Sequence, residues 1–409
     1  MSDDDQGLTF SERIDAPAAA VYDAFTNAAA LREWLCNDAQ IDARAGGRVY
    51  LWWQQGYYTC GEFTALEPDK RAAFTWQGRN EPAVTEVQVS LAAANGRTQV
   101  TLAHTGVGAG VAWTEARREL AQGWESGLAN LKAVLETGLD KRIYDQPFLG
   151  ILIGGVVSEA QAAEMGLPVA GGIRINGTMP GSGAEAAGLQ VGDVLASLGG
   201  ADVTDFASLR AAVAPYRAGE SIKMHYYRHG EKESAPMTLS RRPPPEVPET
   251  PAALAEATCD IYHELDAELD AIFQSVSETE ASRPPAPGQW SAKELIAHLI
   301  ATERVNLVDI PLLISGLGEG DFPHNPPAWT KAIVAVYPTV PELLAALKQA
   351  EAEIVALVAA LPPEFVARKA SYLHLGQWLM SGLVTHSRDH FAEMRAAIAA
   401  ARESVGSEQ

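Results

Sequence analysis

The 409-residue chain is too long for one ordinary hydrophobic core, and its length predicts about two to four domains. With 47% hydrophobic and 20% charged residues, it has the composition of a folded globular protein rather than of a disordered or fibrous one. The net charge of −21 disfavours nucleic acid and anionic membranes, because both need a basic surface. Three cysteines cannot form a disulfide framework, and the acidic start lacks a signal-peptide pattern, so we expect a cytoplasmic protein.

The first segment, residues 1–140, has the pattern of a sheet gripped by a long helix. A strand is predicted at 8–14 and a helix from 16 to 34, followed by strands at 49–53, 59–66, 72–76, 84–91 and 99–104. Asn95-Gly96 predicts a tight hairpin between the last two strands, because both residues accept a positive φ. Apolar residues at helical spacing between Leu120 and Leu135 predict the long helix. The segment therefore has the plan of a helix-grip domain.

Short motifs of this segment resemble those of the START-like SRPBCC proteins, in the branch of the heat-shock-protein ATPase activator. The matching residues are Ile14-x-Ala16-Pro17, Trp34, Gly46-Gly47, Gly61, Trp76, Thr98-x-Val100 and Gly123-Trp124. The resemblance implies an apolar cavity between the sheet and the long helix. The candidates to line it are Trp53, Tyr58, Trp76 and Trp124, although a packed core is the default for each of them. We expect His104 to be structural, since no nucleophile with a partnered base accompanies it.

The middle segment, residues 145–242, carries glycine-containing motifs in a fixed order. They are Phe148-Leu149-Gly150-Ile151, Gly172-Ile173-Arg174-Ile175, Ala186-Ala187-Gly188-Leu189 and Val191-Gly192-Asp193-Val194-Leu195. This order resembles a PDZ domain of the bacterial HtrA type, which implies that a C-terminal peptide tail adds as a strand beside an exposed sheet edge. The resemblance implies a preference for an apolar terminal side chain and the following peptide-binding residues: Phe148, Leu149, Gly150, Ile151, Leu152, Leu209 and Val213. A PDZ module that serves only as a spacer or dimerisation unit is the alternative.

Prolines at 243–245, 248 and 251 predict a stiff linker over 243–251, and the last segment, 252–404, has helical patterns throughout. Helices are predicted at 254–276, from 291 to about 310, at 342–361 and from about 375 to 401. Ser291 and Glu294 form a capping-box pattern at the start of the second helix. Four long helices predict a four-helix bundle. The predicted fold class is therefore multidomain α+β, with a helix-grip α/β domain, a PDZ β-barrel-like domain and an all-α bundle.

Three histidines form the sharpest chemical feature of the last segment. His386 and His390 lie one helical turn apart, so their imidazoles can share a metal ion, and His298 lies on the core-facing stripe of the second helix. From spacing alone, ordinary surface or core histidines are the more frequent explanation. The motif from Gln289 to Leu299, together with the helix of His386 and His390, resembles the DinB/YfiT-like four-helix proteins. That resemblance implies that the three histidines hold a divalent metal ion, with nickel, zinc and iron all suited to imidazole.

The remaining polar residues of this segment give weaker signals. His263, His324 and His374 lack the motif match, and we expect them to be surface or capping residues. Asp389 and Glu393 could orient the ligating histidines, but ordinary solvated charges are the expected outcome.

Three functions stay open at this point. The first is a binding or adaptor protein that combines an apolar-ligand cavity, a PDZ module that recognises protein C-terminal tails, and a divalent-metal site. The second is a metal-dependent enzyme of the thiol transferase or isomerase class that the DinB resemblance implies; it needs substrate-orienting polar residues beside the histidines, and the sequence assigns none. The third, a co-chaperone that activates an ATPase, rests on the SRPBCC resemblance alone. We expect the binding protein, without nucleic acid or membrane as partner, and a homodimer stays open.

Overall fold

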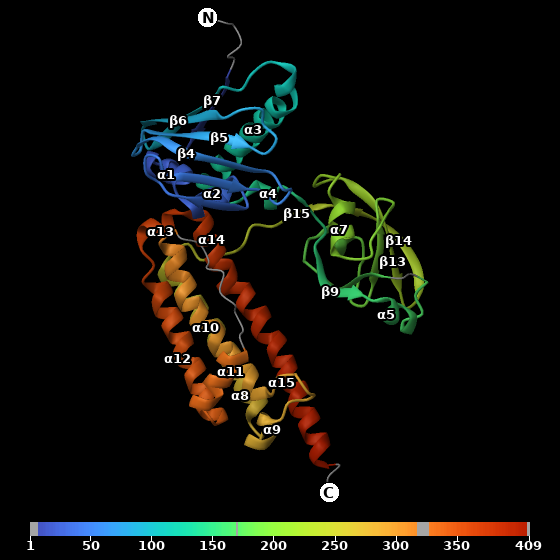
Figure 1. Cartoon of the computed structure of the whole chain (residues 1–409). Coiled ribbons are helices and arrows are strands. Elements are labelled where there is room, and N and C mark those ends of the chain that lie inside the picture. The colour runs from blue at the N-terminus through green and yellow to red at the C-terminus, as the bar shows by residue number, and fades with distance from the viewer. Residues whose placement is uncertain (1–6, 169–170, 317–326, 407–409) are drawn as a thin grey trace, which may run out of the picture. The chain divides into compact units, whose positions relative to one another are not determined.

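The structure, a computed structural model, describes residues 7–168, 171–316 and 327–406. It divides into two compact units, one of Met1–Gly138 with Pro245–Gln409 and one of Leu139–Pro244. Antiparallel sheets and long helices together confirm the predicted α+β class (Figure 1). The domain boundaries given by the sequence stay predictions.

The N-terminal part of the larger unit is a seven-stranded antiparallel sheet in the order β1-β7-β6-β5-β4-β3-β2. Asn95 and Gly96 have φ values of 54° and 76°, as the predicted hairpin between the last two strands requires. Helix α3 (Thr114–Thr137) contributes Trp124 and Leu131 to the core that it shares with the sheet. The strands are β1 (Leu8–Ile14), β2 (Asp38–Ile41), β3 (Arg48–Trp52), β4 (Tyr58–Glu67), β5 (Arg71–Gly78), β6 (Thr85–Ala94) and β7 (Arg97–Thr105).

Two details of this part differ from the sequence prediction. The helix expected over residues 16–34 is divided into α1 (Ala18–Thr26) and α2 (Ala28–Trp34). Asn27 causes the break, because its backbone is extended and its side-chain oxygen accepts a hydrogen bond from the Ala30 N–H at the start of α2. Strand β2 was not predicted, since four residues give too little alternation to stand out.

The smaller unit contains a sheet in the order β14-β13-β11-β10-β9, with β12 paired to β11, and a separate two-stranded pair of β8 and β15. The buried carboxylate of Asp193 is paired with Arg228 at 2.7 Å and stabilises the turn before β11. Strand β9 lies at the sheet edge. The elements are α4 (Lys141–Tyr144), β8 (Pro147–Phe148), β9 (Ile151–Val157), α5 (Glu159–Glu164), β10 (Gly172–Thr178), α6 (Gly183–Ala186), β11 (Val194–Leu198), β12 (Ala201–Asp202), α7 (Phe206–Val213), β13 (Ser221–Arg228), β14 (Glu231–Thr238) and β15 (Ser240–Arg241).

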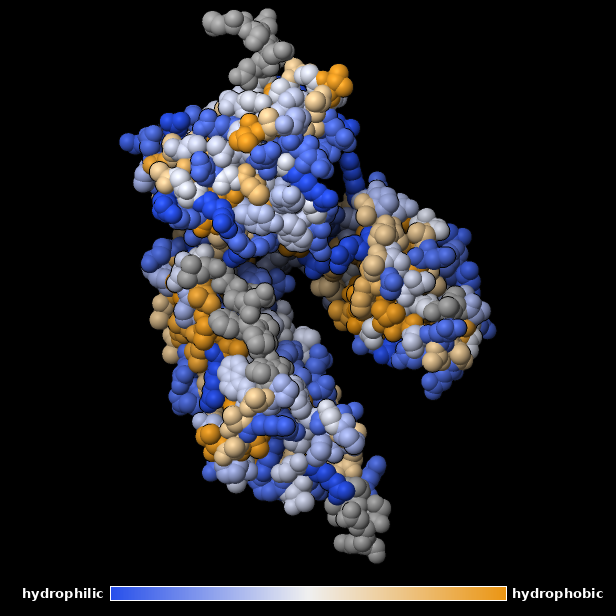
Figure 2. Space-filling model, in the orientation of Figure 1, coloured by the Kyte–Doolittle hydropathy of each residue, from blue (hydrophilic) through white to orange (hydrophobic). Residues whose placement is uncertain are grey.

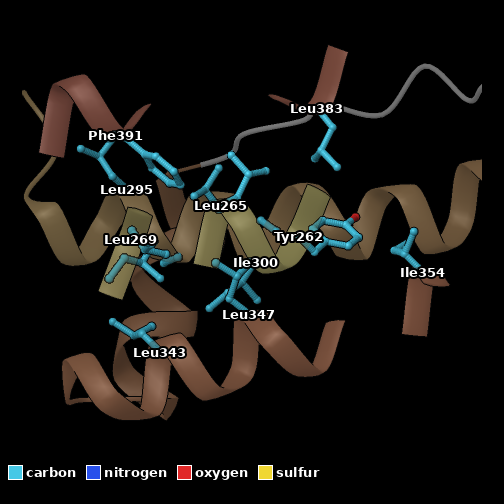
Figure 3. Close-up of a cluster of buried hydrophobic side chains, with 14 of the residues drawn as sticks. Tyr262, Leu265, Leu269, Leu295, Ile300, Leu343, Leu347, Ile354, Leu383 and Phe391 are labelled. Carbon is cyan, nitrogen blue, oxygen red and sulfur yellow. The ribbon is translucent and has the colours of Figure 1, made fainter. Parts of the chain in front are cut away.

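The C-terminal part of the larger unit is helical. Its long helices are α8 (Pro251–Phe273), α10 (Ala292–Ile314), α12 (Val340–Ala359) and α15 (Leu383–Gly406), and its shorter ones are α9 (Glu278–Ser282), α11 (Pro327–Val336), α13 (Pro363–Ala367) and α14 (Lys369–Gln377). Ser291 and Glu294 form the predicted capping box of α10. Figure 3 shows side chains of the four long helices meeting in one core, among them Leu265, Leu295, Leu347 and Phe391.

The predicted fourth helix is interrupted by a π-helical turn at Trp378–Gly382, which separates α14 from α15. The Leu383 N–H donates to the Trp378 carbonyl, five residues back, as in a π-helix. The Trp378 ring lies against Gly382, where a Cβ would come within 2.4 Å of the ring carbon Cε3. The turn therefore needs a glycine to keep this ring in place.

Among the residues that the structure describes, no individual helix combines the length and apolar character needed to cross a membrane. The bent pair of α11 and α12 meets that test only when the two helices are taken together.

Candidate metal centre and binding surfaces

The three histidines singled out in the sequence lie together in the helical part. His298 comes from α10, while His386 and His390 lie one turn apart on α15. One ring nitrogen of each histidine lies within 4.8 Å of those of the other two, and the Nε2 atoms of His298 and His386 are 3.1 Å apart. Packing of α10 against α15 thus joins residues that are 88 positions apart in the chain.

The separation of the His298 and His386 nitrogens fits a shared divalent ion. Two imidazole nitrogens at about 2.1 Å from one ion are separated by about 3.0 Å at a right angle and by about 3.4 Å at a tetrahedral angle. The observed separation of 3.1 Å lies within this range. Burial, followed by the neighbouring imidazoles of His390 and His298, lowers the pKa of His386 to about 4. A neutral imidazole is the form that binds a metal ion.

Glu393 orients one of these rings. Its Oε2 accepts a hydrogen bond of 2.8 Å from His390 Nδ1, which leaves the lone pair of the ring on Nε2. The carboxylate is exposed, as expected of a solvated charge, and its hydrogen bond to His390 is compatible with the orienting role that the sequence left open. On the other side of the cluster, the Trp290 ring lies 5.3 Å from the ring of His298.

A cavity of about 570 Å³ opens beside the histidines, and all three line it. Its apolar walls are formed by Val305, Ile310, Leu313 and Leu375, and its remaining lining by Thr302, Asn306, Asp309, His374 and Trp378. None of these residues was predicted from the sequence to line the site, and His374 was expected to be a surface or capping residue. A signal for some of them was present, because Thr302, Asn306 and Asp309 follow His298 at helical spacing on α10 and so continue its face of the helix.

The helical part also buries two acidic residues, Glu303 on α10 and Glu351 on α12. Glu303 Oε2 accepts hydrogen bonds from Tyr262 Oη at 2.9 Å and from Asn306 Nδ2 at 3.1 Å, so it fixes the orientation of the Asn306 amide. Burial raises the pKa of Glu303. Burial, reinforced by the charges of Asp266 and Glu303, raises the pKa of Glu351 to about 9. Glu351 is therefore protonated over much of the neutral range.

The other histidines of this segment are placed as follows. His374 is exposed and lines the cavity. His263 lies on α8, where its Nε2 is 3.8 Å from the sulfur of Cys259. His324 lies outside the described residues.

The aromatic candidates of the N-terminal part divide into two groups. Trp53, Trp76 and Trp124 lie together, with ring centroids 6.2 Å apart for Trp53 and Trp76 and 5.4 Å apart for Trp76 and Trp124. Trp76 and Trp124 are buried in the core. Tyr58 is 39% exposed and packs instead against Tyr50.

His104 is buried with both ring nitrogens hydrogen-bonded. Trp124 Nε1 donates to Nδ1 at 3.0 Å, so the proton of the ring lies on Nε2, which is 2.7 Å from Thr85 Oγ1. The Thr85 hydroxyl in turn donates to the Trp76 carbonyl. Burial lowers the pKa of His104 to about 4. This closed network supports the structural role expected for the residue.

The PDZ-region candidates surround the start of β9. Gly150 has a φ of 75°, and a Cβ there would lie 2.1 Å from Ser182 Cβ, so only glycine fits this loop. Leu149 and Leu209 are buried in the core of the unit, and Ile151 and Val213 pack against that core.

Two further candidates, Leu152 and Phe148, are not buried. Leu152 is 48% exposed on the edge strand. The Phe148 ring is covered in part by Arg242, whose guanidinium carbon lies 4.7 Å from the ring centre. Ile153 and Val156 on the same strand are also exposed. Figure 2 shows hydrophobic residues gathered on the face of this unit where β9 lies. Within the described residues, β9 therefore has a strand partner on one side alone, and its edge carries exposed apolar side chains.

Three family models match the chain, each in one region. Residues 15–136 match the family of "Activator of Hsp90 ATPase homolog 1-like protein", residues 141–226 match the PDZ domain, and residues 261–394 match the DinB superfamily. These matches confirm the three resemblances found in the sequence.

Curated relatives match over short stretches. A probable periplasmic serine protease do/HhoA-like of Haemophilus influenzae is 31% identical over 109 residues, which are 27% of this chain and 22% of the relative. Serine protease Do-like HtrA of Lactococcus lactis is 31% identical over 24% of each chain, and zinc metalloprotease RasP of Shouchella clausii is 33% identical over 24% of this chain and 23% of its own. The chain thus spans about a quarter of the length of these relatives.

Solved structures match over about a third of the chain. CalU16 of Micromonospora echinospora is 26% identical and covers 30% of this chain and 71% of its own, with a TM-score of 0.26. An HSP90 activator of Plasmodium falciparum is 24% identical and covers 32% of this chain and 96% of its own, with a TM-score of 0.28. The Aha1 dimer of Colwellia psychrerythraea is 23% identical and covers 32% of this chain and 96% of its own, with a TM-score of 0.27. By its family matches, the chain is a multidomain protein that joins an AHSA1-like region, a PDZ domain and a DinB-like region.

Proposed function

We propose that this chain is a multidomain binding protein whose DinB-like region holds a divalent metal ion through His298, His386 and His390. One observation carries the proposal: a nitrogen from each of three imidazoles lies within 4.8 Å of the others at the wall of a cavity. The nitrogens come from two helices of a packed core, so their spacing does not depend on a loop. Zinc, nickel and ferrous iron all suit such a donor set.

The first experiment measures the metal content of the purified, tag-free protein by elemental mass spectrometry. The wild type is expected to carry close to one ion per chain, and the double variant His386→Ala, His390→Ala none. His263→Ala is the matched control, because it removes an exposed helical histidine outside the cluster. Metal loss in the control, or equal metal in the wild type and the double variant, would contradict the proposal.

A metal-dependent enzyme is the second candidate, and the cavity favours it. Three protein ligands leave coordination positions open, as in catalytic rather than structural sites. When bound, a divalent ion there would lower the pKa of a thiol or water ligand. Asn306 is held in one orientation by Glu303 and would present its amide oxygen as a fixed acceptor in the cavity wall. Thiol-transfer assays on metal-loaded and metal-free protein test this candidate.

We also propose that the PDZ domain binds C-terminal peptide tails along β9. Its support is the position of β9 at a sheet edge, the exposed side chains of Leu152 and Ile153, and the tight glycine loop at Gly150. The test compares peptides that end in valine or leucine with the same peptides carrying a C-terminal amide. Binding of the free acids alone supports carboxylate capture, whereas equal binding of the amides contradicts it.

The co-chaperone function, the cytoplasmic location and the homodimer are supported by sequence patterns and family likeness alone. The co-chaperone function rests on the family match of residues 15–136, and the cytoplasmic location and the homodimer stay predictions from the sequence.

A further inference from the structure

Two residues that line the cavity beside the histidines carry buried nitrogens that the described protein atoms do not satisfy. These nitrogens are Nε1 of Trp378 and Nδ1 of His386, and each is buried without a hydrogen-bond partner in the part of the chain that the structure describes. Both residues line the cavity, and their ring centroids lie 6.3 Å apart. Buried polar groups in proteins are nearly always hydrogen-bonded, so these two need an explanation.

The position of Trp378 depends on the π-helical turn. Turns of this kind occur frequently at functional sites, because the extra residue redirects the side chains around it. Here the turn comes directly before the helix that carries His386 and His390, and Gly382 leaves the space that the indole ring occupies. The ring thus lies against Gly382 of its own turn. Its N–H can only donate, because an indole nitrogen has no acceptor role.

The other walls of the cavity indicate what could accept from this N–H. Val305, Ile310 and Leu375 are buried apolar residues, so most of a ligand's surface there would be apolar. Asp309 lines the same cavity, and the chain carries a net charge of −21, so in the metal-free protein both disfavour a free carboxylate. A neutral carbonyl oxygen satisfies a buried donor without adding negative charge.

We propose that this cavity binds an apolar small molecule with a neutral carbonyl group, and that Trp378 Nε1–H donates a hydrogen bond to the carbonyl oxygen. Trp378 is then a positioning residue for a ligand held beside the histidine cluster. The inference rests on the proposed metal-binding function in one respect, the position of the proton on the His386 ring. When Nε2 of His386 faces a metal ion, the proton of the ring lies on Nδ1. The donor of Trp378 needs no metal ion.

The test uses zinc-loaded protein and two probes of nearly equal shape, acetophenone and ethylbenzene, of which only the first has an acceptor oxygen. The readout is the ¹H–¹⁵N spectrum of the indole groups, in which the Trp378 signal is identified by its loss in Trp378→Phe. Acetophenone is expected to shift this proton downfield and to bind about tenfold more tightly than ethylbenzene. In metal-free protein, where no cation attracts a carboxylate, benzoate is expected to bind more weakly than acetophenone.

Two variants separate the hydrogen bond from general packing. Trp378→Phe keeps an aromatic ring but removes the hydrogen-bond donor, and Gly382→Ala displaces the indole ring. Both substitutions are expected to lower the affinity for acetophenone about tenfold. Trp329→Phe is the matched control, a partly buried tryptophan that packs against the core outside the cavity lining. Equal binding of both neutral probes, binding of neither, or tighter binding of benzoate than of acetophenone to the metal-free protein would overturn the inference. Zinc content, measured on the same samples, reports failure of the metal proposal separately.

Discussion

Replacing Glu351 by glutamine should stabilise the helical part of the protein, and the gain should grow as the pH rises. Glu351 lies on α12 and is only 7% exposed. Its carboxyl group lies in a buried environment shared with Glu303 and Asp266, whose charges disfavour its ionisation; Lys348 offsets only part of this effect. Burial is the largest cause, and together these raise the pKa of Glu351 to about 9.

The magnitude follows from the two protonation states. In the unfolded chain Glu351 ionises near its ordinary pKa of 4.5, whereas in the folded protein it ionises near 9. Between these values the folded state holds one proton more than the unfolded state, so the free energy of unfolding falls by about 1.4 kcal/mol for each pH unit. From pH 5 to pH 8 the wild type therefore loses about 4 kcal/mol that a glutamine at this position does not lose.

The assay is urea unfolding at pH 5 and pH 8, followed by hydrogen exchange of peptides from α10 and α12. This readout reports the helical part alone in a chain of several domains. Glu353→Gln is the matched control, because it makes the same chemical change at an exposed position of the same helix. The reasoning is refuted if Glu351→Gln and the wild type show the same change between the two pH values, or if the control shows the same gain.

Two further substitutions test the PDZ loop and the N-terminal core. Gly150→Ala should weaken binding of a valine-terminated peptide at least about tenfold in a fluorescence polarisation assay, because its Cβ would collide with Ser182. Gly188→Ala, which has a similar positive φ but no atom within 4 Å of its Cβ, should leave the affinity unchanged, and equal losses would contradict the account. His104→Leu should lower the free energy of unfolding by about 2–4 kcal/mol, since Trp124 and Thr85 would lose their buried partner. Tryptophan fluorescence during urea unfolding measures this loss, and a change below about 1 kcal/mol would argue against a structural role.

Much of the fold was predictable because it depends on local patterns. The alternation of residues 8–14 and the Asn95-Gly96 turn gave their strand and hairpin at the observed positions. The break at Asn27 was not predicted, since apolar residues continue on both sides of it and only the cap of α2 reveals it. The π-helical turn at Trp378–Gly382 was also missed, because its residues fit an ordinary helix equally well in the sequence.

The candidate site likewise contains residues that the sequence indicated and residues that depend on packing. His386 and His390 share a face by spacing, and the motif around His298 indicated the third member. The burial of Glu303 and Glu351 could not be predicted, since charged residues on helices usually face solvent and only the packing of α8, α10 and α12 encloses these two. The position of the Trp378 ring depends on the π-helical turn, in which the ring lies against Gly382.

X-ray absorption spectroscopy of the metal-loaded protein tests most directly the claim that three named histidines hold one ion. The account predicts three imidazole nitrogens at about 2.0–2.1 Å for zinc. It also predicts that His298→Ala reduces the imidazole count from three to two, while His263→Ala leaves it at three. A spectrum with one imidazole or none in the wild type, or an unchanged count in His298→Ala, would contradict it.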